Sequence, residues 1–79
     1  MTSDDLMVHV VDALESMGGS GSPRDVAKYI WDTHEAELRA SGDMLYTWQY
    51  DTRWAAQKLR DDGVIKPVHR RRDLPWELA

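Results

Sequence analysis

The chain has 79 residues, a length that allows one small domain with a single hydrophobic core. Hydrophobic residues make up 42% of it, a globular rather than a disordered composition, and four Trp and three Tyr supply bulky core material without any Phe. The absence of cysteine excludes a disulfide framework and a thiolate zinc site. No apolar run approaches the roughly 18 residues of a membrane helix, and the acidic N-terminus lacks the basic flank of a signal peptide. We therefore expect a soluble, cytoplasmic protein with no membrane partner.

The net charge of −4 is distributed unevenly along the chain. Residues 1–38 contain two basic and eight acidic side chains, whereas residues 39–79 contain eight basic and six acidic ones. The negative net charge argues against a general nucleic-acid binder. The basic second half keeps nucleic acid among the expected partners, because phosphate groups respond to the local field more than to the total charge.

The first half of the chain predicts two helices. A first helix near residues 4–17 is expected from a cap at Ser3 and from apolar residues that recur at helical spacing after it. The glycine-rich residues 18–21 end it in a turn with one or two extended residues. A second helix begins at Ser22-Pro23 and runs to about His34, and residues 35–40 continue it in a bent or frayed form.

The second half predicts a third helix and a hairpin. Thr47 is the expected cap of the helix, which ends at residues 61–63. Residues 64–65 then form a short strand, residues 69–73 a charged connection, and residues 74–78 a return strand. The buried face of the third helix is predicted from side chains at i, i+4, i+7 and i+11, namely Trp48, Thr52, Ala55 and Leu59.

Aromatic residues are concentrated at the start of the third helix: Tyr46, Trp48, Tyr50 and Trp54. Core packing is the favoured interpretation in a domain without Phe, with Tyr50 as the most exposed member. The alternative is a platform that stacks on an extruded or modified base.

Three helices followed by a hairpin are the order of the winged helix-turn-helix fold. The expected fold class is therefore mainly α with a small β-hairpin, a three-helix core plus a C-terminal wing, and residues 1–79 form a single domain. In helix-turn-helix units a later helix enters the major groove of DNA.

The stretch TRWAAQKLRDDGVI, read with the closing WELA, resembles the N-terminal winged-helix domain of Mrr-type restriction endonucleases. In that family a tryptophan, a small residue and a leucine on the third helix precede a glycine and an aliphatic strand, and the return strand carries a late tryptophan. The counterparts here are Trp54, Ala55, Leu59, Gly63, Val64, Ile65 and Trp76. The resemblance implies a DNA-recognition domain without a nuclease core, alone or tethered to a catalytic domain, in a restriction-modification or regulatory system.

The residues predicted to bind double-stranded DNA lie on the third helix and in the hairpin connection. On the helix, the face opposite the core presents Gln49, Arg53, Gln57 and Arg60. Arg can donate two hydrogen bonds to guanine, and Gln can pair bidentately with adenine. At the expected wing, side chains suited to phosphate or the minor groove are Lys66, His69, Arg70, Arg71 and Arg72. The alternatives are a solvated helix face and a charged turn that keeps a hairpin edge soluble.

Acidic residues on and after the third helix oppose DNA binding and favour a second function. Asp51 lies between the readout candidates, and Asp61 and Asp62 lie at the end of the helix, where they would repel phosphate if they faced it. A winged-helix domain used for protein contact, as a homodimer or an adaptor, is therefore the alternative prediction.

Catalytic and metal-binding motifs are not expected. His34-Glu35 resembles the start of a zinc-protease motif, but Leu38 stands where a second histidine is needed. The three histidines are far apart in the sequence, and no two of them have ligand spacing on one helix. We expect neither an enzyme nor a cofactor or metal site.

Overall fold

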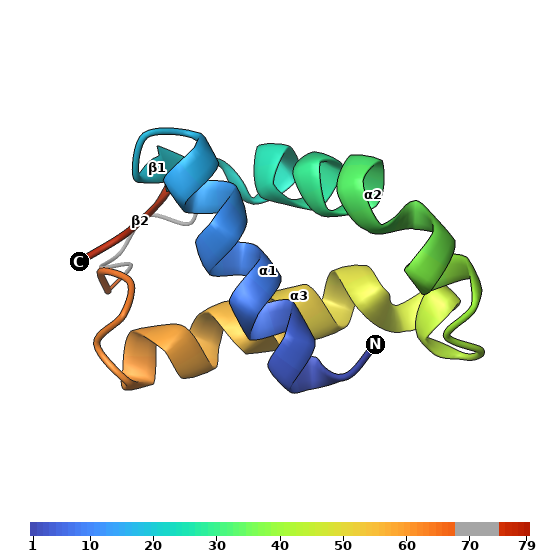
Figure 1. Ribbon diagram of the computed structural model, residues 1–79. Coiled ribbons are helices and arrows are strands. Elements are labelled where there is room, and N and C mark those ends of the chain that lie inside the picture. The colour runs from blue at the N-terminus through green and yellow to red at the C-terminus, as the bar shows by residue number, and fades with distance from the viewer. Residues whose placement is uncertain (68–74) are drawn as a thin grey trace.

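The computed structural model describes residues 1–67 and 75–79 (Figure 1). Within these residues the protein is mainly helical with a small two-stranded antiparallel sheet, which confirms the coarse fold class. The elements, in chain order, are α1 (Ser3–Ser16), β1 (Ser20–Gly21), α2 (Pro23–Arg39), α3 (Met44–Asp61) and β2 (Trp76–Glu77). None of the helices described has the length and hydrophobicity needed to cross a lipid bilayer.

The three helices enclose a single core. In Figure 1, α2 and α3 run in opposite directions along the long dimension of the molecule, α1 crosses α3, and the sheet lies at the end where α2 begins. The buried hydrophobic residues come from all three helices and from the sheet region: Leu6, Val10, Ala13, Leu14, Val26, Ile30, Leu38, Trp48, Ala55, Ala56, Leu59, Ile65 and Trp76.

The start of α1 differs by one residue from the prediction. Thr2, rather than Ser3, is the N-cap, and its hydroxyl accepts a hydrogen bond from the backbone N–H of Asp5 at 3.2 Å. The Asp5 carboxylate accepts one from the Thr2 N–H at 2.9 Å. This reciprocal capping box satisfies two backbone donors that a helix start leaves unpaired, which explains why Thr2 serves as the cap.

The start of α2 agrees with the prediction, whereas the start of α3 does not. The Ser22 hydroxyl caps α2 by accepting from the Asp25 N–H at 3.1 Å. Helix α3 begins at Met44, three residues before the expected cap Thr47, because nothing in residues 44–46 breaks a helix. Thr47 lies inside the helix and donates to Asp51 Oδ2 at 2.9 Å.

Helix α2 bends at His34 and continues beyond it, in agreement with the bent continuation expected for residues 35–40. The backbone of His34 is non-helical, with φ −129° and ψ 21°, and the helix then continues to Arg39. Beside the bend, the Thr33 hydroxyl donates to the Tyr29 carbonyl at 2.7 Å, a side-chain bond that commonly bends helices. Leu38 beyond the bend is fully buried, so the last turns of α2 belong to the core.

The predicted buried face of α3 is confirmed, but the core assignment of the aromatic cluster is wrong for two residues. Trp48 is buried, as are the other three residues of that face. Tyr46 is 85% exposed and Trp54 is 55% exposed, beside Tyr50 at 63%. Residues 46, 50 and 54 are four apart, so they share the side of the helix that points away from the core.

The C-terminal segment pairs with two other parts of the chain. Strand β2 pairs antiparallel with β1, with Gly21 opposite Trp76, and Ile65 forms an antiparallel bridge with Leu78. The predicted pairing of residues 64–65 with the returning segment is therefore seen at Ile65, while the strand itself covers Trp76–Glu77 rather than all of residues 74–78. The predicted DNA contacts His69 and residues 70–72 lie outside the described residues.

Candidate nucleic-acid interface

The outer face of α3 carries the predicted readout residues. Gln49, Arg53 and Gln57 are exposed, and Arg60 is half-buried. These four side chains divide into two groups, because the first two line a groove next to α2 and the last two are hydrogen-bonded near the sheet.

A groove of about 960 Å³ lies between the first turns of α2 and the first half of α3. Arg24 and Lys28 of α2 and Gln49 and Arg53 of α3 contribute polar side chains to its lining. Aromatic side chains also line it, and the rings of Trp31 and Trp48 stack there with their centroids 5.9 Å apart. The groove thus combines cationic groups from two neighbouring helices with a rigid aromatic wall.

The charges around the groove are mostly positive. Lys28 Nζ lies 2.6 Å from Asp32 Oδ2, and this hydrogen bond raises the pKa of the Lys28 ammonium, which stays charged at neutral pH. Among the described residues, neither Arg24 nor Arg53 has a carboxylate within salt-bridge distance. Two carboxylates offset part of this positive charge: Asp32, which is paired with Lys28, and Asp25, which lines the same groove.

Gln57 and Arg60 make contacts within the domain. Gln57 donates to Asp61 Oδ1 at 3.0 Å and accepts from Arg60 Nη1 at 3.3 Å. The Arg60 guanidinium lies over the Trp76 ring, 5.7 Å from its centroid, and burial lowers the pKa of this guanidinium. Arg60 therefore connects α3 to β2, and both hydrogen-bonding groups of the Gln57 amide already have partners.

Lys66, the last predicted site residue that the structure describes, forms an ion pair with strand β2. Lys66 Nζ lies 3.3 Å from Glu77 Oε2, and both side chains are largely exposed. An exposed ion pair of this kind contributes little stability. Of the predicted site residues, the structure thus brings together Gln49 with Arg53 in the groove and Gln57 with Arg60 near the sheet.

Sequence reasoning missed two features of the molecule. Arg24 and Lys28, the two basic residues of the acidic half, face the same groove as Arg53, and their spacing of four at the start of a helix was the available signal. His9 and His34 stack with ring centroids 3.7 Å apart, although 25 residues separate them. No sequence spacing indicates that contact, because it depends on how α1 packs on α2.

Comparisons with known proteins do not assign a family. No protein-family model matches the chain, and neither a curated protein nor a solved structure is significantly similar to it. The resemblance to the Mrr-type domain stays a prediction, and function has to be argued from the side chains.

Proposed function

We propose that the chain is a winged-helix domain that binds double-stranded DNA. The order of the elements supports this fold, because β1 lies between the first two helices and the third helix leads into Ile65. The C-terminal segment bonds to β1 on one side and to Ile65 on the other, as the last strand of a winged helix does. The wing predicted from the sequence falls between residues 67 and 75, outside the described residues.

The groove between α2 and α3 carries the functional proposal. In helix-turn-helix domains the first helix of the motif crosses the DNA backbone and the second lies in the major groove. Arg24 and Lys28 on the first turns of α2 are suited to phosphate, while Gln49 and Arg53 on α3 have the donors that base edges require. Lys66, His69 and the three arginines at 70–72 would anchor the wing to phosphate or the minor groove.

Fluorescence anisotropy with a labelled DNA duplex tests this function. We expect saturable binding that weakens steeply with salt, because phosphate contacts release counterions. Arg53→Ala should weaken binding about tenfold, as the loss of one good base contact does. Replacing residues 70–72 by Ala should weaken binding equally on all sequences and flatten the salt dependence.

Lys58→Ala is the matched control for Arg53→Ala. Lys58 is exposed on the same helix and has the same charge, but it lies about 140° around the helix axis from Arg53. Its replacement should change the affinity less than twofold. Equal losses for the two variants, or no anisotropy change with wild-type protein, would contradict the proposal.

A protein-contact function is the second candidate, and the exposed aromatic residues of α3 favour it. Tyr46, Tyr50 and Trp54 form one stripe, and the rings of Tyr50 and Trp54 meet edge to face with centroids 6.3 Å apart. Tyr and Trp are enriched at protein interfaces. If this stripe joins two copies, the sedimentation coefficient will rise with protein concentration, and Trp54→Ala will abolish the rise.

A further inference from the structure

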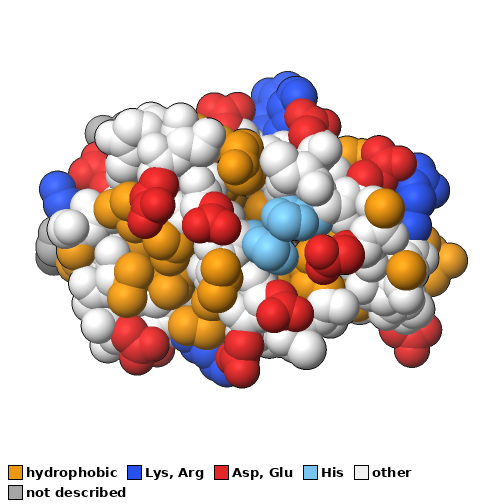
Figure 2. All heavy atoms as spheres, in the orientation of Figure 1, with side chains coloured by type: hydrophobic (Ala, Val, Ile, Leu, Met, Phe, Trp, Pro, Cys, Tyr) orange, Lys and Arg blue, Asp and Glu red, His pale blue; other side chains and the backbone are white. Residues whose placement is uncertain are grey.

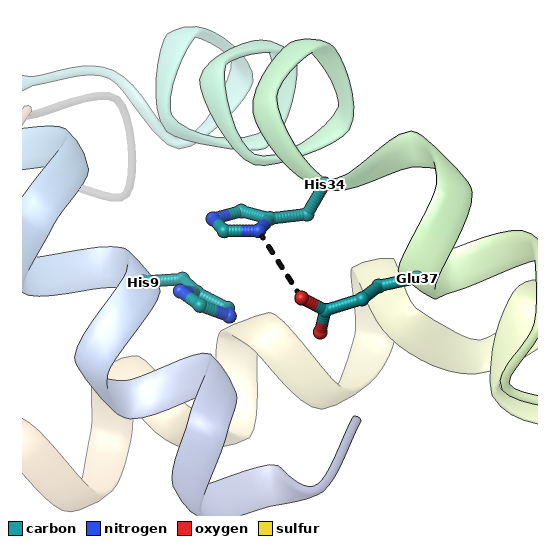
Figure 3. A group of neighbouring side chains, drawn as sticks. All are labelled: His9, His34 and Glu37. Carbon is teal, nitrogen blue, oxygen red and sulfur yellow. Dashed lines mark ion pairs between the residues drawn. The ribbon is translucent and has the colours of Figure 1, made fainter.

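His9 of α1 and His34 at the bend of α2 lie against each other, and Glu37 lies one helical turn further along (Figure 3). The two imidazole rings are stacked with an interplanar angle of 27°. His34 Nδ1 is 3.9 Å from Glu37 Oε1, and one donor atom from each of the three residues lies within 4.8 Å of the others. Figure 2 shows the two histidines side by side at the surface with acidic side chains around them.

We propose that His9, His34 and Glu37 bind a divalent transition-metal ion, with zinc as the best-fitting ion. Imidazole nitrogen and carboxylate oxygen are established zinc ligands, and two imidazoles with one carboxylate leave a fourth tetrahedral position for water. Imidazole also distinguishes the site from a calcium or magnesium site, which oxygen ligands dominate.

Metal binding requires both the donor distances and the orientation of the two rings to change. With zinc–ligand bonds of about 2.0–2.1 Å, neighbouring donors in a tetrahedral site are roughly 3.3 Å apart. The present donors, within 4.8 Å of one another, need to close by at most about 1.5 Å. Because imidazole nitrogens bind a metal in the plane of the ring, the two rings, now stacked with 27° between their planes, must turn out of the stack to point at one ion. The exposed Glu37 side chain, three residues from His34 on α2, must rotate toward them.

The electrostatics of the cluster favour a cation. Burial, and next the proximity of His34, lower the pKa of the His9 imidazole. The carboxylates of Glu37, Asp5 and Asp12 lie close enough to act on His9. His9 Nδ1 is buried and has no hydrogen-bond partner among the described residues. The ring pair therefore has a nitrogen atom without a hydrogen-bond partner, and negatively charged carboxylates lie nearby.

A metal ion at this position would join α1 to α2 beside the bend. Such a link stabilises the folded chain, because the three donors come together only when it is folded. The site shares no residue with the groove that carries Arg24, Lys28, Gln49 and Arg53. Metal binding and DNA binding can therefore be measured independently.

Calorimetric titration of the chelator-treated full chain with zinc chloride at pH 7.5 tests the proposal. We expect one saturable site and a rise in Tm on the order of 10 °C when free zinc is about 100-fold above Kd. Cobalt should give the visible absorption of a tetrahedral site with nitrogen and oxygen ligands. Glu37→Gln should weaken zinc binding at least tenfold, and His34→Asn should abolish it.

Two variants serve as controls. Glu35→Gln changes an acid two residues away that is bonded to Arg39, and His69→Gln removes the third histidine of the chain. Both should keep the wild-type zinc affinity. Glu37 is exposed, so Glu37→Gln should leave the circular dichroism spectrum unchanged even if His34→Asn does not fold. No saturable binding, unchanged affinity in Glu37→Gln, or a loss in His69→Gln as large as in Glu37→Gln would overturn the proposal.

Discussion

At the scale of single residues, Arg53 and Arg60 show that two arginines on the same helix can make different contacts. Arg53 lines the groove, whereas Arg60, seven residues later, lies over Trp76 and donates to Gln57. A cation over an indole ring contributes roughly 0.5–2 kcal/mol, depending on how far the pair is desolvated. The two arginines lie on one side of the helix, so their difference arises from the Trp76 ring of β2, which lies against the Arg60 guanidinium.

Asp5 provides a pH-dependent prediction at the same scale. The Thr2 backbone N–H donates to the carboxylate of Asp5, and this hydrogen bond is the main reason that the pKa of Asp5 lies below its usual value. Since the pKa is lower in the folded than in the unfolded chain, the stabilisation is complete above about pH 5 and is lost as the pH falls through the folded-state pKa.

The variant Asp5→Asn tests the direction of this pH dependence of stability, because it keeps an acceptor oxygen but removes the charge. Thermal unfolding followed by circular dichroism should show a lower Tm for the variant at pH 6. The difference from wild type should shrink toward zero as the pH approaches about 2. A difference in Tm that is constant from pH 6 to pH 2 would contradict this role for the carboxylate.

At the scale of elements, the end of α3 determines how the chain enters the sheet. Gly63 has φ +78°, and its N–H donates to the Arg60 carbonyl at 3.0 Å. The Val64 N–H donates to the Leu59 carbonyl at 2.8 Å, which completes a Schellman motif. This glycine turn directs the chain to Ile65 and its bridge to the C-terminal segment.

Substitution of Gly63 should therefore reduce stability in a graded way. A left-handed conformation costs an ordinary L-residue about 1 kcal/mol or more, whereas Asn tolerates it better. Urea unfolding followed by tryptophan fluorescence should give a free energy of unfolding that decreases from wild type to Gly63→Asn to Gly63→Ala. A Gly63→Ala variant as stable as wild type, or more stable than Gly63→Asn, would contradict this account of the turn.

At the scale of the whole molecule, the structural features that were predicted correctly from the sequence are those that depend on local residue pattern. Apolar spacing identified three helices and the buried face of α3, because those residues pack together wherever the helix starts. The start of α3 at Met44 was missed, since a competent cap such as Thr47 does not prevent a helix from extending further back. The exposure of Trp54 was missed because composition does not reveal which aromatic residues the core has room for.

In the candidate sites, too, features set by local sequence pattern were predicted and features set by tertiary packing were not. Gln49 and Arg53 were predicted from helical spacing, and both line the groove. The contributions of Arg24 and Lys28 depend on how α2 packs beside α3, and the meeting of His9 with His34 depends on how α1 packs beside the bend in α2. Such arrangements are set by tertiary packing: the spacing of Arg24 and Lys28 places both on one side of α2 but does not show which helix they face.

The central claim is that duplex DNA binds across the groove between α2 and α3. A titration of ¹⁵N-labelled protein with duplex DNA, followed by two-dimensional ¹H–¹⁵N spectra, tests it most directly. We predict that the largest shift changes occur at Gln49, Arg53 and the first turn of α2, that they reverse at high salt, and that resonances around His9 on α1 stay in place. Absence of shift changes at the groove, or changes concentrated on α1, would contradict the claim.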